Sequence, residues 1–389
     1  MIFDNTEIEL LRLAAWFKGL PAELSEWFSS PVFDPAGIEA LKSLRLLYAS
    51  QERRQYRLTP TGWDFLAGIG FTYPQDAKYI SDPVKLRRRE QAAKVMFTFY
   101  RAGFQIFCDC LEALEQPGVF LAAEAMQRSL RLQNTKVWNG LRLCGIGRFG
   151  NCGCLLHFTD ERGLYFVNEM NRFRRAAIAC DRAVSIYAAS RYADAAYWLR
   201  HEPPAGEKKH KSDWVSFRQA ARMTQLPLHL LECSDAGALQ LLLMQAPNYR
   251  ERAARLILAE GYRPAHPALP DTDALLPDTG KGPRPLVAAM DMDLKRLERA
   301  IEAAASLGCG QLAVAAFPEQ LEALVGLFGQ EGNVVFYQVE KEEVARALRL
   351  SLYAPERSPF LDGKGEYVHV SQIPQRKRSG RPPAPKLEP

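Results

Sequence analysis

The stretch that decides the fold of the N-terminal region runs from residue 44 to residue 62 and reads LRLLYASQERRQYRLTPTG. Residues 47–50 and 55–58 are short runs containing leucine and tyrosine, and the polar residues QERR separate them. Two such runs with a polar connection predict a β-hairpin with a charged tip. Thr59-Pro60 then places a helix-capping residue before a proline, so we expect a helix over residues 63–67.

Three helical patterns precede this hairpin. In residues 6–18 and in the shorter run 22–28, apolar residues recur at helical spacing along one side. A third pattern begins at Asp34-Pro35, an N-cap residue followed by proline at the first helical position. The order helix, helix, helix, charged hairpin, helix predicts a winged helix-turn-helix domain over residues 1–72.

The same run, residues 44–62, resembles the third-helix-to-wing signature of winged-helix regulators of the MarR and PadR types. The resemblance implies that the third helix enters the major groove of double-stranded DNA and that the wing touches phosphate. The matching DNA-binding positions are Lys42, Ser43 and Arg45 for the helix and Arg53, Arg54 and Arg57 for the wing. This helix has few groups that could read bases, so we expect weakly specific contact with the backbone. The alternative is a winged helix used for protein contacts.

Composition predicts a folded protein of several domains that meets a polyanion. The chain has 389 residues, 47% of them hydrophobic, which suits two or three packed domains. Its net charge is +5, and basic residues cluster at 85–89, 208–211 and 376–378. No run of 18 apolar residues and no basic signal-peptide start occurs, so we expect a cytoplasmic protein without membrane contact. Solvated surface is the alternative explanation of the basic clusters.

The cysteines are interpreted as buried thiols rather than as zinc ligands. The chain has eight cysteines, and a cytoplasmic protein keeps them reduced. Cys108 and Cys110 fall in a long helix predicted over residues 84–115, and Cys152 and Cys154 form a second pair. Structural zinc sites usually have two to four residues between paired ligands, and these pairs have one. Small buried apolar side chains are therefore the favoured interpretation.

Beyond the first domain, the overall class predicted is α/β (α+β overall), with a larger α/β domain that has a mixed sheet. Residues 73–118 are predicted to be a linker with the long connecting helix, and residues 119–213 a β-rich and helical middle region that includes a helix at 172–189. Apolar strands alternate with helices over residues 214–370, as in a covered sheet. The basic, proline-rich residues 371–389 predict disorder. The GxGxxG at residues 145–150 lacks a following helical pattern, so no dinucleotide site is predicted.

One constellation late in the chain could carry chemistry. Pro270-Asp271 precedes an apolar run, and Asp293-Leu294-Lys295 follows another, as in the PD-(D/E)xK pattern of many nucleases. In that pattern Asp271 and Asp293 would bind Mg²⁺, with Asp291 as a further metal ligand, and Lys295 would stabilise charge on the phosphate. The alternative, which we favour, is that Asp291 and Asp293 cap a helix beginning at Leu294. No cofactor is expected in that case, and Mg²⁺ only if the nuclease-like site is intact.

The layout as a whole resembles the replication-relaxation proteins of bacterial plasmids and conjugative elements. The segments that carry the resemblance are "LTPTG", "LRRREQAAKVMFTFYRAG" and "LPDTDALL … PLVAAMDMD … GQLAVAAF", and they cover roughly half of the chain. The resemblance implies a winged helix joined to a PD-(D/E)xK-like domain, acting on double-stranded DNA in plasmid-type replication, relaxation or transfer. It also implies partners such as a second copy or other replication and transfer proteins. Asp291 stands where the family usually has Glu, which weakens the expectation of catalysis. The alternatives are a transcriptional regulator with a ligand- or partner-binding α/β domain, and a Mg²⁺-dependent nuclease.

Overall fold

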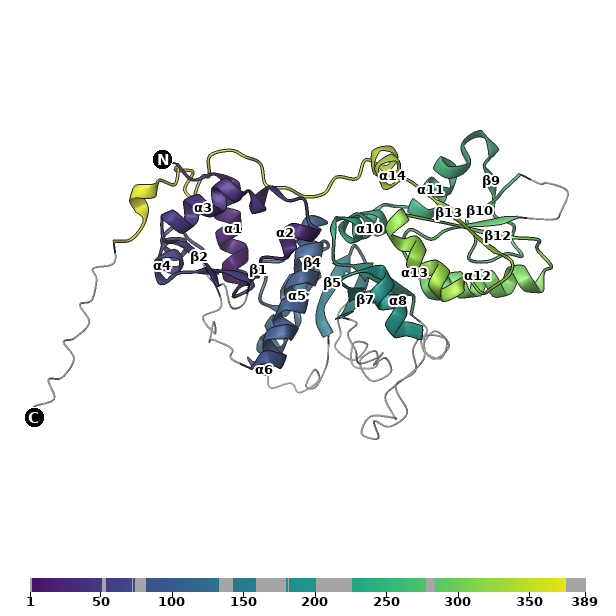
Figure 1. The fold of residues 1–389 in the computed structure, drawn as a ribbon, viewed down its shortest axis with the longest axis horizontal. Coiled ribbons are helices and arrows are strands. Elements are labelled where there is room, and N and C mark those ends of the chain that lie inside the picture. The colour runs from purple at the N-terminus through teal and green to yellow at the C-terminus, as the bar shows by residue number, and fades with distance from the viewer. Residues whose placement is uncertain are drawn as a thin grey trace, which may run out of the picture. The chain divides into compact units, whose positions relative to one another are not determined.

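The computed structural model divides the chain into two compact units that both contain helices and β-strands (Figure 1). Unit 1 comprises Met1–Tyr79 with Ala354–Pro389, and unit 2 comprises Ile80–Tyr353. The structure describes residues 2–50, 54–71, 73, 82–132, 143–158, 180, 182–200, 226–277 and 284–375. In this described part, no helix is both long enough and apolar enough to cross a membrane.

Unit 1 contains a small antiparallel sheet packed with helices. In chain order its elements are α1 (Asn5–Trp16), β1 (Leu20–Pro21), α2 (Leu24–Trp27), α3 (Pro35–Ser43), β2 (Leu47–Ser50), β3 (Gln55–Leu58) and α4 (Pro60–Gly68). The strand order is β1-β3-β2, and β2 and β3 form a hairpin in which Leu47 lies opposite Leu58. The hairpin and the helix starting at residue 35 were both predicted from the sequence.

Local capping explains where the helices of unit 1 begin. Asp4 accepts a hydrogen bond from the Glu7 backbone at 2.8 Å, and the Glu7 side chain accepts in return from Asp4, so α1 starts with a capping box. Thr59 caps α4 by accepting from the Gly62 backbone at 3.0 Å. Gly62 leaves room for the crossing chain, because an added Cβ would lie 2.2 Å from the carbonyl oxygen of Leu46.

The segment after residue 353 belongs to unit 1. Phe3 donates a backbone hydrogen bond to Val368 at 3.0 Å, and Phe360 donates to Phe3 at 2.8 Å. The sequence had grouped residues 354–370 with the α/β domain, because an irregular segment carries no periodic pattern that reveals its docking partner. Of the predicted tail, residues 371–375 are described, including part of a 3₁₀ turn at Val370–Gln372, and residues 376–389 lie outside the described residues.

Unit 2 contains two mixed five-stranded sheets. The first has the order β4-β5-β6-β7-β8: β4 (Val119–Ala122), β5 (Leu143–Phe149), β6 (Cys152–Phe158), β7 (Arg182–Ala189) and β8 (Leu228–Glu232). Strands β4 to β6 are antiparallel, and β6 to β8 are parallel. Its helices are α5 (Pro83–Arg101), α6 (Ala123–Leu132), α8 (Tyr192–Arg200) and α10 (Asp235–Gln245).

The second sheet repeats this plan. Its strands are β9 (Arg263–Pro264), β10 (Ala274–Leu275), β11 (Pro285–Ala288), β12 (Leu312–Ala316) and β13 (Val334–Gln338), antiparallel from β9 to β11 and parallel from β11 to β13. Its helices are α11 (Tyr249–Leu258), α12 (Leu294–Ser306), α13 (Pro318–Phe328) and α14 (Lys341–Leu348). Buried side chains of both sheets, such as Tyr187, Leu230 and Val314, share one hydrophobic core. The predicted α/β class with a mixed sheet is confirmed.

Two predicted helices were wrong. The helix expected over residues 84–115 ends at Arg101, because Gly103 turns the chain with a φ of +78° and Phe104 donates back to the Phe99 carbonyl. Residues 182–189 of the helix expected at 172–189 form strand β7 instead. This strand is central and parallel, so both of its faces are buried and it lacks the alternation that marks a half-exposed strand. Residues 172–179 lie outside the described residues.

Candidate functional site

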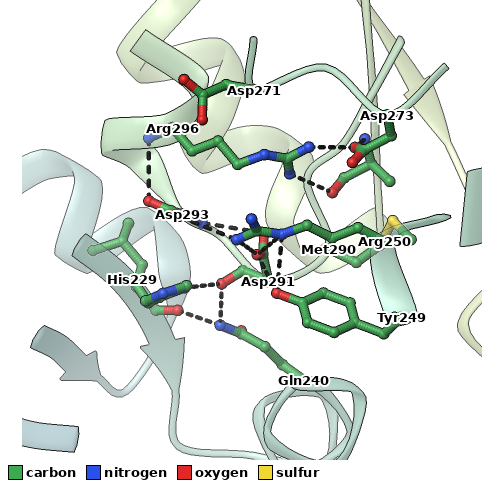
Figure 2. A network of polar contacts seen from close by, with 12 residues as sticks. His229, Gln240, Tyr249, Arg250, Asp271, Asp273, Met290, Asp291, Asp293 and Arg296 are labelled. Atoms are coloured by element: carbon green, nitrogen blue, oxygen red, sulfur yellow. Dashed lines mark hydrogen bonds and ion pairs between the residues drawn. The ribbon is translucent and has the colours of Figure 1, made fainter. Parts of the chain in front are cut away.

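Acidic residues gather where the chain leaves β11 and enters α12 (Figure 2). Asp293 is the N-cap of α12, and its Oδ1 accepts from the Arg296 backbone at 3.1 Å. The predicted capping role of Asp293 is therefore confirmed. Met292 between the two aspartates has a φ of +53°, in the left-handed region that costs a non-glycine residue energy. This bend lets Asp291 and Asp293 both meet Arg250.

Asp291 is the most buried acid of this group, with 1% of its side chain exposed. Its Oδ2 accepts from the Tyr249 hydroxyl at 2.5 Å and from Arg250 Nε at 2.9 Å and Nη2 at 2.5 Å. Arg250 Nη2 also donates to Asp293 Oδ2 at 3.1 Å. Burial alone would raise the pKa of Asp291, but Arg250 and the other nearby cations lower that pKa below its ordinary value. Asp291 is therefore a permanently charged acceptor for Arg250 at neutral pH.

The two acids before β10 have arginine partners of their own. Asp271 forms a two-pronged pair with Arg299, at 2.8 Å from Nε and 2.7 Å from Nη2. Asp273 pairs with Arg296 at 2.5 Å and accepts from the Ala288 backbone at 2.7 Å, which ties β10 to β11. Arginine side chains thus neutralise all four carboxylates of this region.

The predicted metal and catalytic residues are not assembled as a metal site. Both carboxylate oxygens of Asp271, Asp291 and Asp293 already accept hydrogen bonds from protein groups. Among the described residues, no group of three or more His, Cys, Asp or Glu side chains could hold a metal ion. Mg²⁺ needs free oxygen ligands, so these residues do not fit the ion that a nuclease of this pattern would use.

Lys295 departs from the nuclease pattern as well. Lys295 is the second residue of α12. In the nuclease pattern the lysine lies at a strand end, beside a carboxylate that binds metal. Its side chain is half-buried, and burial together with Arg299 lowers its pKa. The sequence predicted that Lys295 follows a strand over residues 285–290, and β11 ends at Ala288, seven residues before Lys295.

A buried polar network holds the loop after β11 in place. His229 Nδ1 donates to the Asp291 carbonyl at 2.8 Å, and Gln240 Nε2 donates to the same oxygen at 2.8 Å and to Leu230 at 2.7 Å. His229 and Gln240 are 2% and 0% exposed. Sequence reasoning missed Tyr249, Arg250, His229 and Gln240, because they lie 41 to 62 residues from Asp291 in the chain and no spacing connects them.

An open cleft of about 1260 Å³ lies in unit 2 beside this network. The start of α11, the turn between β5 and β6, and the first residues of β7 and β8 all contribute to its wall. Arg182, Arg250 and Arg299 line it, together with Asp273 and Asp293. Charged side chains from elements of both sheets of unit 2 therefore meet at this cleft.

The predicted DNA-binding residues lie in unit 1. Lys42, on the last turn of α3, pairs with Glu39 at 2.6 Å, while Ser43 and Arg45 are exposed. Arg45 has a φ of +57°, which ends the helix. Arg54 is 78% exposed and lies 3.6 Å from Glu26, and Arg57 on β3 is half-buried opposite Tyr48. Arg53 lies outside the described residues.

The cysteines are buried or partly buried except Cys110, which is exposed, so the prediction of a buried thiol is wrong there. Cys108, in an irregular segment rather than a helix, donates to the Phe120 carbonyl at 3.2 Å, and burial raises its pKa to about 12. Cys154 is fully buried, and burial raises its pKa strongly. High pKa values keep these thiols protonated and poor as nucleophiles or ligands.

Comparison of the chain with protein-family models, with curated proteins and with solved structures finds no match. Function therefore has to be argued from the arrangement of the chain's own residues.

Proposed function

We propose that the protein binds double-stranded DNA through unit 1, which we interpret as a winged helix-turn-helix. The observation that carries the proposal is the element order α1-β1-α2-α3-β2-β3, with β1 added to the β2–β3 hairpin in the sheet order β1-β3-β2. In this interpretation α3 is the helix that enters the major groove and the hairpin is the wing.

The charges of unit 1 favour contact with phosphate over base readout. The outer side of α3 carries Glu39 and Ser43, and Glu39 neutralises Lys42. Among the described residues of α3 and the hairpin, Arg45 has no carboxylate partner, and Arg54 at the hairpin tip lies 3.6 Å from Glu26 with 78% of its side chain exposed. Phosphate contacts fix orientation on DNA but carry no sequence information, so binding should be strongly dependent on salt and weakly specific.

We further propose that the protein acts in replication, relaxation or transfer of a mobile genetic element. The support is the order of the second sheet of unit 2, in which α11 leads into the antiparallel strands β9 to β11, and α12 leads into the parallel strand β12. In this order the Pro-Asp and Asp-x-Lys segments lie before β10 and after β11, which supports the resemblance in the order of its segments. Arginines pair with the acids there, so the proposed role is binding rather than cutting of DNA.

A mobility-shift titration on several unrelated duplexes at two or more salt concentrations tests the first proposal. Arg54→Ala combined with Arg57→Ala should weaken binding about equally on every duplex and reduce the salt slope by roughly one to two units. Lys364→Ala, an exposed cation of the same unit outside α3 and the hairpin, serves as the control and should change little. Equal affinity of the double variant and the wild type would remove the hairpin from the DNA contact.

A ligand-responsive transcriptional regulator is the second candidate function, and the cleft of about 1260 Å³ in unit 2 favours it. Its volume exceeds that of most small-molecule sites, and it is lined by both aromatic and charged groups. In this case a small molecule that binds unit 2 should change the affinity of unit 1 for duplex DNA. Titration of a preformed DNA complex with the ligand would measure that coupling.

A further inference from the structure

The cleft of unit 2 is rich in unused hydrogen-bond donors, although acids and arginines are nearly balanced in number there. A carboxylate paired with arginine has its oxygens occupied, as both oxygens of Asp271, Asp291 and Asp293 are. A guanidinium carries five N–H donors, so one such pair leaves several donors over. The wall also carries the carboxylates of Glu251 and Asp273, which pair with Arg255 and Arg296, and the N–H groups left over on its own arginines are its unused donors.

Three arginines supply these donors. In the described part of the chain, Arg250 uses Nε and Nη2 toward Asp291 and Asp293, and its Nη1 has no partner. Arg299 likewise uses Nε and Nη2 toward Asp271, with 52% of its side chain exposed. Arg182, at the start of β7, is exposed and has no carboxylate partner among the described residues. All three line the cleft.

The start of α11 adds backbone donors to the same wall. Residues 248–251 line the cleft, and α11 is 10 residues long. Its N-cap residue Asn248 is in the left-handed region, with a φ of +51°, and its side chain makes no capping hydrogen bond. The first backbone N–H groups of a helix lack intrahelical acceptors and carry partial positive charge. An anionic oxygen in the cleft would satisfy them.

We propose that this cleft binds a phosphate group without a metal ion, using Arg182, Arg250, Arg299 and the N-terminus of α11. Arg250 lies between Asp291 and Asp293, where a divalent ion would have to lie in a nuclease, and the two carboxylates hold its guanidinium in a fixed orientation. A fixed guanidinium suits phosphate, because the two remaining N–H donors of Arg250 Nη1 are held in a defined direction. The phosphate belongs either to a single DNA strand or to a free nucleotide.

The test uses the full chain in buffer with EDTA, so that a metal ion cannot mediate binding. One arm measures fluorescence anisotropy of a labelled single-stranded oligonucleotide of about 12 nucleotides, a length typical of such sites. The other arm measures binding of ATP and of inorganic pyrophosphate by calorimetry. Arg182→Gln and Arg299→Gln are the test variants. Arg346→Gln is the matched control, because Arg346 is an exposed arginine of α14 that does not line the cleft.

We expect binding of at least one probe, weakened about tenfold or more by each test variant and unchanged by the control. Oligonucleotide binding alone would identify the source as a DNA strand, and binding of ATP and pyrophosphate would identify a free nucleotide. Absence of binding to every probe, or equal loss in Arg346→Gln, would overturn the proposal. Arg299→Gln leaves Asp271 without its partner, so it can also lower the melting temperature. In that case the affinity of Arg182→Gln for the probes decides whether the cleft binds phosphate. The outcome is independent of duplex binding by unit 1, which the Arg54 and Arg57 variants report.

Discussion

Replacement of Asp291 by asparagine tests how much the buried arginine pairs contribute to unit 2. Asp291 is 1% exposed and accepts three hydrogen bonds from Tyr249 and Arg250, two of them charged on both sides. Removing one partner of a buried ion pair costs about 3–5 kcal/mol, because the other charge stays buried without compensation. Arg250 keeps Asp293, and asparagine keeps one acceptor oxygen, so we expect the lower end, about 3 kcal/mol.

Asp271→Asn is the matched control, since it breaks the same chemical pair in a different environment. Asp271 also binds its arginine through two bonds, but 52% of the Arg299 side chain is exposed. Solvent-exposed ion pairs contribute about 0–1 kcal/mol. Asparagine also tolerates the left-handed backbone that Asp271 adopts, with a φ of +69°, so the substitution adds little strain.

Urea unfolding followed by circular dichroism measures both variants. With an m-value of about 3 kcal/mol per molar urea, Asp291→Asn should lower the midpoint of the unit 2 transition by roughly 1 M. Asp271→Asn should lower it by less than about a third of that. If the two variants shift the midpoint equally, burial does not set the strength of these pairs, and the explanation given for Asp291 is wrong.

Three further outcomes are expected. Since the pKa of Asp291 is below its ordinary value in the folded state, its contribution is complete above about pH 5. The contribution declines as the pH falls below that ordinary value, 3.8, and is lost when the pH passes the lower pKa of the folded state. Asp291→Asn should therefore flatten the acid limb of a stability–pH curve, and an unchanged limb would contradict this. Mg²⁺ or Mn²⁺ should leave the melting temperature of the wild type unchanged, because the carboxylate oxygens are occupied, and a rise in that temperature would show a metal site. In α4, Gly62→Ala should destabilise unit 1 by about 1–3 kcal/mol, because the added Cβ clashes with Leu46. Gly68→Ala is the control, and it should be neutral or slightly stabilising because the space around Gly68 is open. Thermal melts in which Gly68→Ala is the less stable variant would contradict the packing described.

Capping and turn signals in the sequence correctly predicted α3, the β2–β3 hairpin and the start of α12. Proline after Asp34 marked the start of α3, the tyrosine-bearing runs marked the β2–β3 hairpin, and Asp293 marked the cap of α12. The physical reason is that a cap or a tight turn depends on groups within a few residues of each other. The start of α3 was predicted correctly, but the capping bond expected there was not found. The Asp34 side chain makes no hydrogen bond to the helix backbone and lies 3.4 Å from Arg357.

Tertiary structure alone decided the chemistry of the acidic cluster. The sequence placed Asp271, Asp291 and Asp293 near strand ends, but it carried no sign that Arg250 and Arg299 would neutralise them. Those pairs join residues 28 to 43 positions apart, and only the packing of α11 and α12 brings them together. Strand β7 was missed for a related reason, since burial of both of its faces between parallel neighbours removes the alternation that sequence patterns detect. Local interactions thus fixed where elements begin and end, and long-range packing fixed which charges meet.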